Sequence, residues 1–163
     1  MPGSRIVSDL YSDWNELMKP LPHTYTASAR LSEDEVIIES AGLPGLTTAA
    51  PADFGGPGDL WSPETLLVAA VSDCFILTFK AIARASRLDY DGVRCEVSGV
   101  LDKLDSGTCF THINIVASAT IPNGADADKA KKLLEKAESN CLITNSLKAE
   151  VSFEAEVEVA NAS

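Results

Sequence analysis

The feature that most constrains this sequence is a long apolar stretch with a strong helix start in front of it. Ser62 is a favoured N-cap, Pro63 suits the first helical position, and Glu64 places an acid in the first turn. Nearly every residue over 65–83 is then apolar or small. A helix that is apolar on most of its faces is buried. We therefore expect a buried central helix over residues 63–87.

The patterns on either side of this helix predict a mixed fold. Alternating or β-branched runs predict strands at 24–31, 35–40, 46–50, 93–104, 108–120 and 148–159. Apolar spacing predicts an amphipathic helix over 126–139, and a further short helix over 140–147 with Asn140 as its cap. The element order indicates an α+β protein, with an antiparallel sheet packed against the long central helix.

Length and charge limit the organisation and the classes of partner. A chain of 163 residues is one domain by size, and we expect an N-terminal arm over 1–22 followed by a single domain over 23–163. The net charge of −11 argues against nucleic acid and against an anionic membrane surface as binding partners.

The N-terminus has no apolar signal segment, and the longest apolar run, 66–71, is too short to cross a bilayer. We expect a cytoplasmic protein.

The four cysteines are therefore expected in a reducing compartment, where they serve as metal ligands, reactive thiols or core residues. Cys74 lies midway along the central helix, which alone is compatible with simple core packing. Cys141 lies near an expected helix N-terminus, where the helix dipole lowers the pKa of a thiol, although core packing after a helix end explains it equally well.

The other two cysteines are interpreted as structural. A hairpin turning at 105–106 places Cys95 opposite Val116 and Cys109 opposite Asp102, which argues against a disulfide between them. No Cys or His spacing of the zinc type is present, so no metal site is predicted.

Two segments resemble the OsmC/Ohr family of organic hydroperoxide resistance proteins. The first is the Gly-rich loop and helix start over 51–67, which leads to Cys74 ten residues after Glu64. The second is AESNCLITNSL over 137–147, which resembles the segment that holds the second cysteine of that family. The resemblance covers about residues 23–158.

The resemblance implies a thiol-dependent peroxidase that forms an intertwined homodimer with its active sites at the subunit interface. Cys74 would become a sulfenic acid on reducing a small apolar organic hydroperoxide, and Cys141 would resolve it to a disulfide. No bound cofactor is implied. An external dithiol, with a lipoyl protein as one candidate, would reduce the disulfide.

The resemblance also implies an arginine that activates the thiolate, held by Glu64. Arg30 is the only arginine between residues 6 and 83, although an ordinary surface role fits it equally well. Ten helical residues separate Glu64 from Cys74 by about 15 Å along the axis. A shared arginine therefore favours a glutamate supplied by a partner subunit.

Four aromatic residues are candidates for an apolar substrate pocket, although core packing explains each of them as well: Phe54, Trp61, Phe75 and Phe79. Two residues depart from the family pattern. Asp73 stands where a small residue precedes the first cysteine, and Leu142 stands where a proline often follows the second. These departures leave open a binding protein with weak or no peroxidase activity, and beside it a structural dimer with inert thiols.

Overall fold

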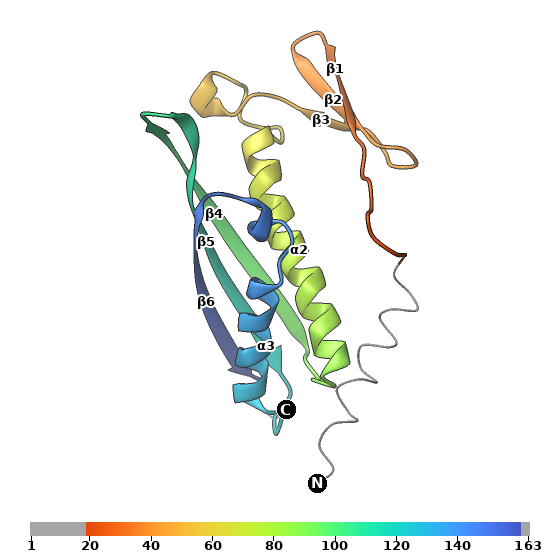
Figure 1. Ribbon diagram of the computed structural model, residues 1–163, viewed down its shortest axis with the longest axis vertical. Coiled ribbons are helices and arrows are strands. Elements are labelled where there is room, and N and C mark those ends of the chain that lie inside the picture. The colour runs from red at the N-terminus through yellow and green to blue at the C-terminus, as the bar shows by residue number, and fades with distance from the viewer. Residues whose placement is uncertain (1–18, 161–163) are drawn as a thin grey trace. The chain divides into compact units, whose positions relative to one another are not determined.

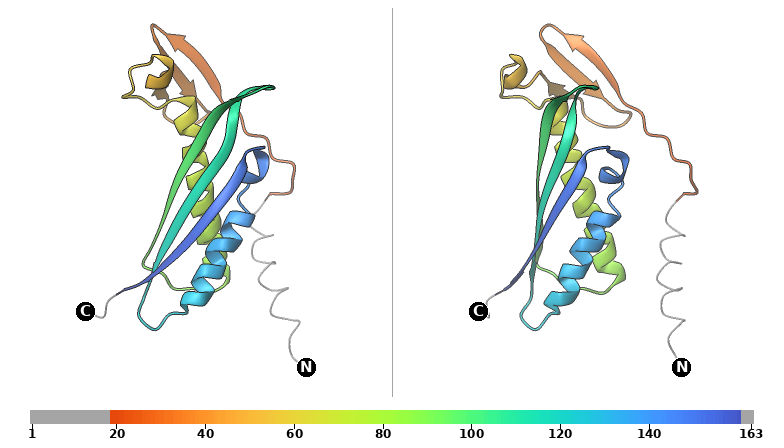
Figure 2. Two further views of the ribbon diagram at one scale, coloured as in Figure 1. Left: turned by 90° about the vertical axis from the view of Figure 1, so that its left-hand side faces the viewer. Right: turned by 60° about the vertical axis from the view of Figure 1, so that its left-hand side comes forward.

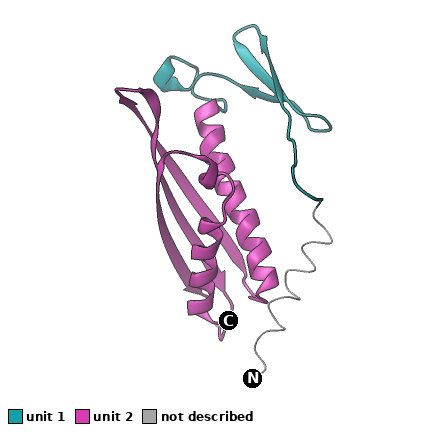
Figure 3. Cartoon of the chain, in the orientation of Figure 1, with its two compact units in different colours: residues 1–61 teal, residues 62–163 magenta. Residues whose placement is uncertain are grey.

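The computed structural model describes residues 19–160, which divide into two compact units at residues 61 and 62 (Figure 3). The expected N-terminal arm, 1–22, lies almost wholly outside the described residues. The first unit, residues 1–61, contains a small antiparallel sheet in the order β1-β2-β3. Its elements are β1 (Ser28–Ser32), β2 (Glu35–Glu39), β3 (Leu46–Thr48) and the 3-10 helix η1 (Ala52–Phe54).

The second unit, residues 62–163, is a three-stranded sheet with two helices on one face (Figures 1 and 2). Its elements are α2 (Pro63–Ala85), β4 (Gly92–Leu104), β5 (Gly107–Ile121), α3 (Ala127–Ser139), the 3-10 helix η2 (Thr144–Ser146) and β6 (Glu150–Val159). Helix α2 packs on β4, α3 packs on β6, and the two helices also contact each other. This unit holds the candidate cysteines.

Helix α2 begins as the sequence predicts, with a capping box. The Ser62 hydroxyl accepts from the Thr65 backbone N–H at 3.2 Å, and the Ser62 backbone N–H donates to the Thr65 hydroxyl at 2.8 Å. The expectation of burial on most faces is wrong for the single chain. One side is fully buried, at Val71, Phe75 and Phe79, because the sheet and α3 cover only that side.

The sheet of the second unit is mixed rather than antiparallel. Strands β4 and β5 form the predicted antiparallel hairpin, but β6 pairs with β5 in parallel. The physical reason is α3, which carries the chain back along the sheet, so that β6 starts at the same end as β5. By alternation, β6 turns the side chains of 151, 153, 155 and 157 inward, whereas Val159 at its end is exposed.

A β-bulge corrects the predicted register of the hairpin. Asp102 does lie opposite Cys109, but the register shifts between Val100 and Leu101, so Cys95 pairs with Ala117 and not with Val116. The bulge leaves one extra residue in β5. Turn position alone cannot reveal such an insertion within a strand.

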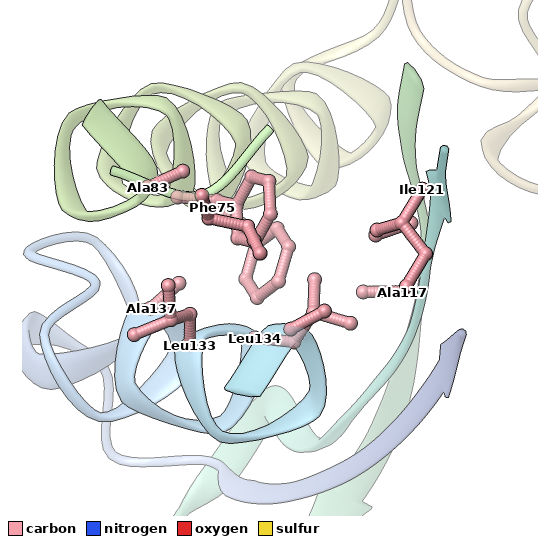
Figure 4. Packing of buried hydrophobic residues seen from close by; sticks show 11 residues of the cluster. Phe75, Ala83, Ala117, Ile121, Leu133, Leu134 and Ala137 are labelled. Atoms are coloured by element: carbon pink, nitrogen blue, oxygen red, sulfur yellow. The ribbon is translucent and has the colours of Figure 1, made fainter. Parts of the chain in front are cut away.

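The main core lies between α2, α3 and the sheet (Figure 4). Phe75 contacts Phe153 of β6 with ring centroids 5.7 Å apart, and Leu134 of α3 and Ile121 of β5 close the cluster. A second, smaller cluster is built around Val71 with Ile113 and Ile115. By length and composition alone α2 could cross a membrane, but core helices of soluble proteins also pass that test.

Candidate redox site

Cys74 lies midway along α2, one turn after Val71 and directly before the buried Phe75. Its side chain is partly buried, at the edge between the packed side of the helix and the open side. A thiol in this position is held by a rigid helix and retains access from outside the core. It is the more accessible of the two candidate thiols, because Cys141 is completely buried.

Cys141 follows the end of α3 and is fixed by the backbone on both sides. Its N–H donates to the Glu138 carbonyl at 2.9 Å, and its carbonyl accepts from the Asn145 N–H at 3.1 Å. Its Sγ lies 4.0 Å from the Val71 carbonyl of α2. The segment after α3 therefore turns this thiol toward the middle of α2.

The two candidate thiols are neighbours in the fold, although 67 residues separate them in the sequence. The Cys74 side chain lies near enough to affect the pKa of the Cys141 thiol, and no disulfide joins the two. Burial is the largest effect on Cys141 and raises the pKa of its thiol, and the neighbouring Cys74 raises it further. Two neighbouring thiols can form a disulfide once one sulfur is oxidised and the two sulfurs reach bonding distance.

The expectation of a lowered pKa for Cys141 is wrong in its net direction. Asn140 caps the end of α3 and does not begin a new helix, and η2 starts only after Ile143. The hydroxyl and backbone N–H of Thr144, at the start of η2, do favour the Cys141 thiolate, but burial outweighs them. With the Cys141 thiol protonated, the single hydrogen of the Thr144 hydroxyl is donated to the Cys141 carbonyl at 3.1 Å.

Cys95 lies near Cys141, and its place in the core is compatible with the structural role expected of it. It packs against both core clusters from the inner face of β4. Burial raises the pKa of Cys95 to about 12, and the nearby Cys141 and Glu96 contribute to the increase. Cys109, in contrast, is exposed near the tip of the hairpin. All four cysteines are free thiols.

Glu64 lies in the first turn of α2, as predicted, and one of its carboxylate oxygens is unusual. Oε2 is buried and has no hydrogen-bond partner within the described part of the chain. A buried carboxylate oxygen without a donor is costly, so this position favours a cation or another donor from outside the described residues.

Arg30 lies on β1 in the other unit. Its Nε is 3.7 Å from Oε2 of Glu39 on β2, and both side chains are half exposed. Such an exposed pair is weak, about 0–1 kcal/mol, and does little to restrain the guanidinium group.

The four aromatic candidates separate into two groups. Phe75 and Phe79 are fully buried; Phe75 contacts Phe153 and Phe79 contacts Tyr90 at a centroid distance of 5.3 Å, so core packing accounts for both. Phe54 and Trp61 are exposed by 61% and 49% in the first unit.

Sequence reasoning missed two residues of this site. Thr144 belongs to no recognisable motif, although the hydroxyl of a Thr three residues after a Cys can donate a hydrogen bond to the carbonyl of that Cys. Cys95 was missed because the bulge and the packing of β4 against α2 decide its neighbours. Among residues 19–160, no group of three or more His, Cys, Asp or Glu side chains is arranged to hold a metal ion.

The fold and the paired thiols define a small α+β protein with a cysteine couple between a central helix and the segment after α3. A family model described as OsmC-like protein matches residues 56–156. The chain therefore belongs to the OsmC-like protein family.

Two bacterial proteins are similar to this chain in sequence. An uncharacterized protein of Bacillus subtilis, YmaD, is 29% identical over 114 residues, which are 67% of this chain and 75% of that protein. Peroxiredoxin OsmC of Escherichia coli is 27% identical over 93 residues, which are 57% of this chain and 64% of that protein. The family thus includes peroxiredoxins, and membership supports a peroxidase-type redox function.

Solved structures share the fold. An OsmC-like protein of unknown function from Vibrio cholerae is 20% identical, with a TM-score of 0.73, covering 85% of this chain and 100% of that one. An organic hydroperoxide resistance protein OsmC from Legionella pneumophila is 23% identical, with a TM-score of 0.69, covering 86% of this chain and 100% of that one.

Proposed function

We propose that this protein reduces organic hydroperoxides to alcohols, with Cys74 as the attacking thiol and Cys141 as the resolving thiol. The observation that carries the proposal is the proximity of these two thiols, brought together from distant parts of the chain. Core packing alone explains one buried cysteine, but it gives no reason for a second thiol to lie near the first. Membership of a family that contains peroxiredoxins supports the same chemistry.

The difference in burial supports the two proposed roles. Cys74 is partly exposed, so a hydroperoxide can reach it, whereas Cys141 has no exposed surface. Burial and the neighbouring thiol also raise the pKa of Cys141 and keep it protonated at neutral pH. A protonated thiol is a poor nucleophile. Cys141 is therefore suited to react with the sulfenic acid of Cys74 and not to attack the peroxide first.

The reaction balances as two steps followed by reduction. The Cys74 thiolate attacks the distal oxygen of ROOH, the O–O bond breaks, and the leaving RO⁻ takes a proton to give ROH. Cys141 then attacks the sulfur of the sulfenic acid, gives up its proton, and the hydroxyl leaves as water. The resulting Cys74–Cys141 disulfide takes two electrons from an external dithiol, with a lipoyl protein as a candidate.

The environment of Glu64 supports a cation in the proposed active site. Its buried Oε2 lacks a donor, and an arginine would satisfy it while favouring a nearby thiolate. Glu64 and Cys74 are about 15 Å apart along α2, so one arginine can serve both if the glutamate comes from a partner subunit or if the arginine bridges an unusually long distance, and we favour the first. We therefore include a homodimer in the proposal, with Arg30 as the candidate arginine and Phe54 and Trp61 as candidate pocket residues.

The proposed setting is the cytoplasm, where thiols are kept reduced between turnovers. The net charge of −11 favours an uncharged apolar substrate over phosphate-bearing or membrane partners.

The test is the loss of free thiols after one equivalent of cumene hydroperoxide is added to the reduced protein. The wild type is expected to lose two thiols within seconds, Cys74→Ser none, and Cys141→Ser to stop at a sulfenic acid that dimedone traps. Cys109→Ser is the matched control, because its exposed thiol lies away from the pair, and it should behave like the wild type. If the wild type keeps its thiols for many minutes, the peroxidase proposal fails and a binding role replaces it.

A further inference from the structure

The outer face of the sheet in the second unit carries a hydrogen-bonded network that the proposed redox chemistry does not use. Helices α2 and α3 cover the opposite face (Figure 2). The Ser152 hydroxyl of β6 lies 3.1 Å from Nε2 of His112 on β5, and it donates to Oδ1 of Asn114 at 2.6 Å. Nδ1 of His112 lies 3.9 Å from Oε2 of Glu150. A hydroxyl, an imidazole and a carboxylate thus follow one another in the order used by hydrolases with a serine nucleophile.

The register of the strands brings these side chains together. In the parallel pairing of β5 and β6, His112 lies opposite Glu150 and Asn114 lies opposite Ser152. Residues two apart on a strand point to the same face of a sheet. Ile113, between His112 and Asn114, is buried in the core under α2. The four polar residues therefore project from the outer face.

The β-bulge in β5 lies directly beside His112. Val100 of β4 pairs with His112 and Leu101 pairs with Phe110, so Thr111 is the extra residue. Its hydroxyl donates to the Val100 carbonyl at 3.3 Å. A bulge bends its strand and re-aims the neighbouring side chains, and bulges are over-represented next to active sites. The irregularity supports a functional position for His112.

We propose that Ser152 and His112, with Glu150 as the positioning residue, form a second catalytic site that hydrolyses neutral carboxylic esters through an acyl group on Ser152. This activity goes beyond the proposed peroxidase function and does not depend on it. The substrate class follows from the charge of the surface. Glu154 and Glu156 are exposed beside the site on β6, and together with Glu150 they repel an anionic ester.

Glu150 sets the protonation of the imidazole. A carboxylate beside Nδ1 favours the neutral tautomer that carries its hydrogen on Nδ1, so the lone pair of Nε2 faces the Ser152 hydroxyl. The hydroxyl hydrogen rotates about the C–O bond and can therefore turn from Asn114 to Nε2 of His112. The 3.9 Å between His112 and Glu150 is long for a hydrogen bond, and such distances often tighten when substrate binds.

The reaction balances as the hydrolysis of one ester by one water molecule. Oγ of Ser152 attacks the ester carbonyl carbon while its proton passes to Nε2 of His112. The C–O bond to the leaving group then breaks, and the alcohol takes that proton. A water molecule, which gives a proton to His112, attacks the acyl group and releases a carboxylic acid, and the proton returns to Ser152.

The open position of the site limits the expected acceleration. The side chains of His112 and Glu150 are 34% and 88% exposed, so solvent takes part in stabilising the charge that develops on the carbonyl oxygen. A positioned general base contributes about 10²–10⁴-fold. We expect the lower end of this range, with a kcat/KM about a hundredfold above that of Ser152→Ala.

The first experiment is covalent labelling of the reduced full-length wild type with a fluorophosphonate, which reacts with activated serines. Mass spectrometry of the digested protein identifies the labelled peptide. The label is expected on Ser152, and it should be lost in His112→Ala. Because the reagent targets serine and not cysteine, the result is independent of the peroxidase proposal.

The second experiment is the hydrolysis of p-nitrophenyl acetate. It uses a Cys74→Ala and Cys109→Ala background, because accessible thiols also react with this ester. Ser152→Ala and His112→Ala should each lower kcat/KM about a hundredfold. Glu150→Gln should lower kcat about tenfold and leave KM unchanged, because Glu150 acts through His112 and does not contact the substrate.

A matched control is available on the same face of the sheet. Ser118 of β5 lies opposite Glu156, about 20 Å along the strand from His112. Ser118→Ala should therefore leave both the labelling and the ester hydrolysis unchanged. Circular dichroism establishes that each variant is folded, and the labelling of the wild type stands even if a variant is not.

Three results would overturn the inference. A wild type that takes no fluorophosphonate on Ser152 would mean that its hydroxyl is not activated. Ester hydrolysis that is lost in His112→Ala but kept in Ser152→Ala would make the imidazole itself the nucleophile. Equal rates in all variants would reduce the network to a set of hydrogen bonds that hold the pairing of β5 and β6.

Discussion

The raised pKa of Cys95 makes a specific prediction about stability at alkaline pH. In the folded chain its pKa is about 12, against an ordinary value of 9.0. Between these values the folded chain keeps a proton that the unfolded chain has lost, so stability falls as the pH rises. Below about pH 9 both states are protonated and this penalty is absent. Replacing Cys95 by Ala removes the penalty.

The expected size follows from the same two values. At about pH 10.5, one and a half pH units above the ordinary value, the penalty is at most about 2 kcal/mol, since one unit corresponds to 1.36 kcal/mol. Because Cys95 is only partly buried, solvent screening lowers the expectation to about 1 kcal/mol.

The assay is urea unfolding of the reduced wild type and Cys95→Ala at about pH 8 and pH 10.5. At pH 8 we expect the variant to be less stable by about 1 kcal/mol, because it loses the packing of the sulfur. At pH 10.5 that difference should shrink by about 1 kcal/mol and approach zero. Cys109→Ala, which removes an exposed thiol, should show the same small difference at both pH values. An unchanged difference for Cys95→Ala would refute the claim that its thiol is held protonated in the core.

Two further predictions concern the packing at Gly99 and the attack of Cys141 on the sulfenic acid. Gly99→Ala should lower the free energy of unfolding in urea by about 1–3 kcal/mol, because a Cβ there would lie 2.7 Å from a Phe110 ring carbon. Gly92→Ala is the control and should be close to neutral, because nothing lies within 4 Å of the added Cβ. Equal costs for the two variants would argue against the close approach at Gly99. Thr144→Val removes a hydroxyl that favours the Cys141 thiolate, so the pKa of Cys141 should rise further. Under the proposed mechanism the sulfenic acid should then persist severalfold longer in stopped-flow trapping with dimedone, and an unchanged lifetime would exclude a role for this hydroxyl.

The main elements of the second unit were predictable because their signals are local. The capping residues of α2 fix its first turn, Asp126 caps α3 through the Lys129 N–H at 2.9 Å, and the alternation of β6 matches its inward and outward faces. Each of these features depends on residues a few positions apart. The paired cysteines were inferred from family resemblance, and their proximity in the fold agrees with it.

Where the sequence prediction failed, the cause was contact between distant segments. Cys141 was expected at a helix start with a lowered pKa, but its burial under α2 raises it. Cys95 was expected opposite Val116, but one extra residue in β5 moves it opposite Ala117. The direction of β6 depended on the crossover through α3, which a strand pattern does not record.

The sequence by itself determined where the helices and strands lie, because capping groups, apolar periods and turn residues act over a few positions. Only the tertiary structure decided which side of α2 is covered, which thiols are neighbours, and that burial raises the pKa of Cys141. Cys74 and Cys141 become neighbours because α3 returns the chain to the middle of α2. Their difference in burial supports their proposed roles and arises only from packing, because in an unfolded chain both thiols would be equally exposed to solvent.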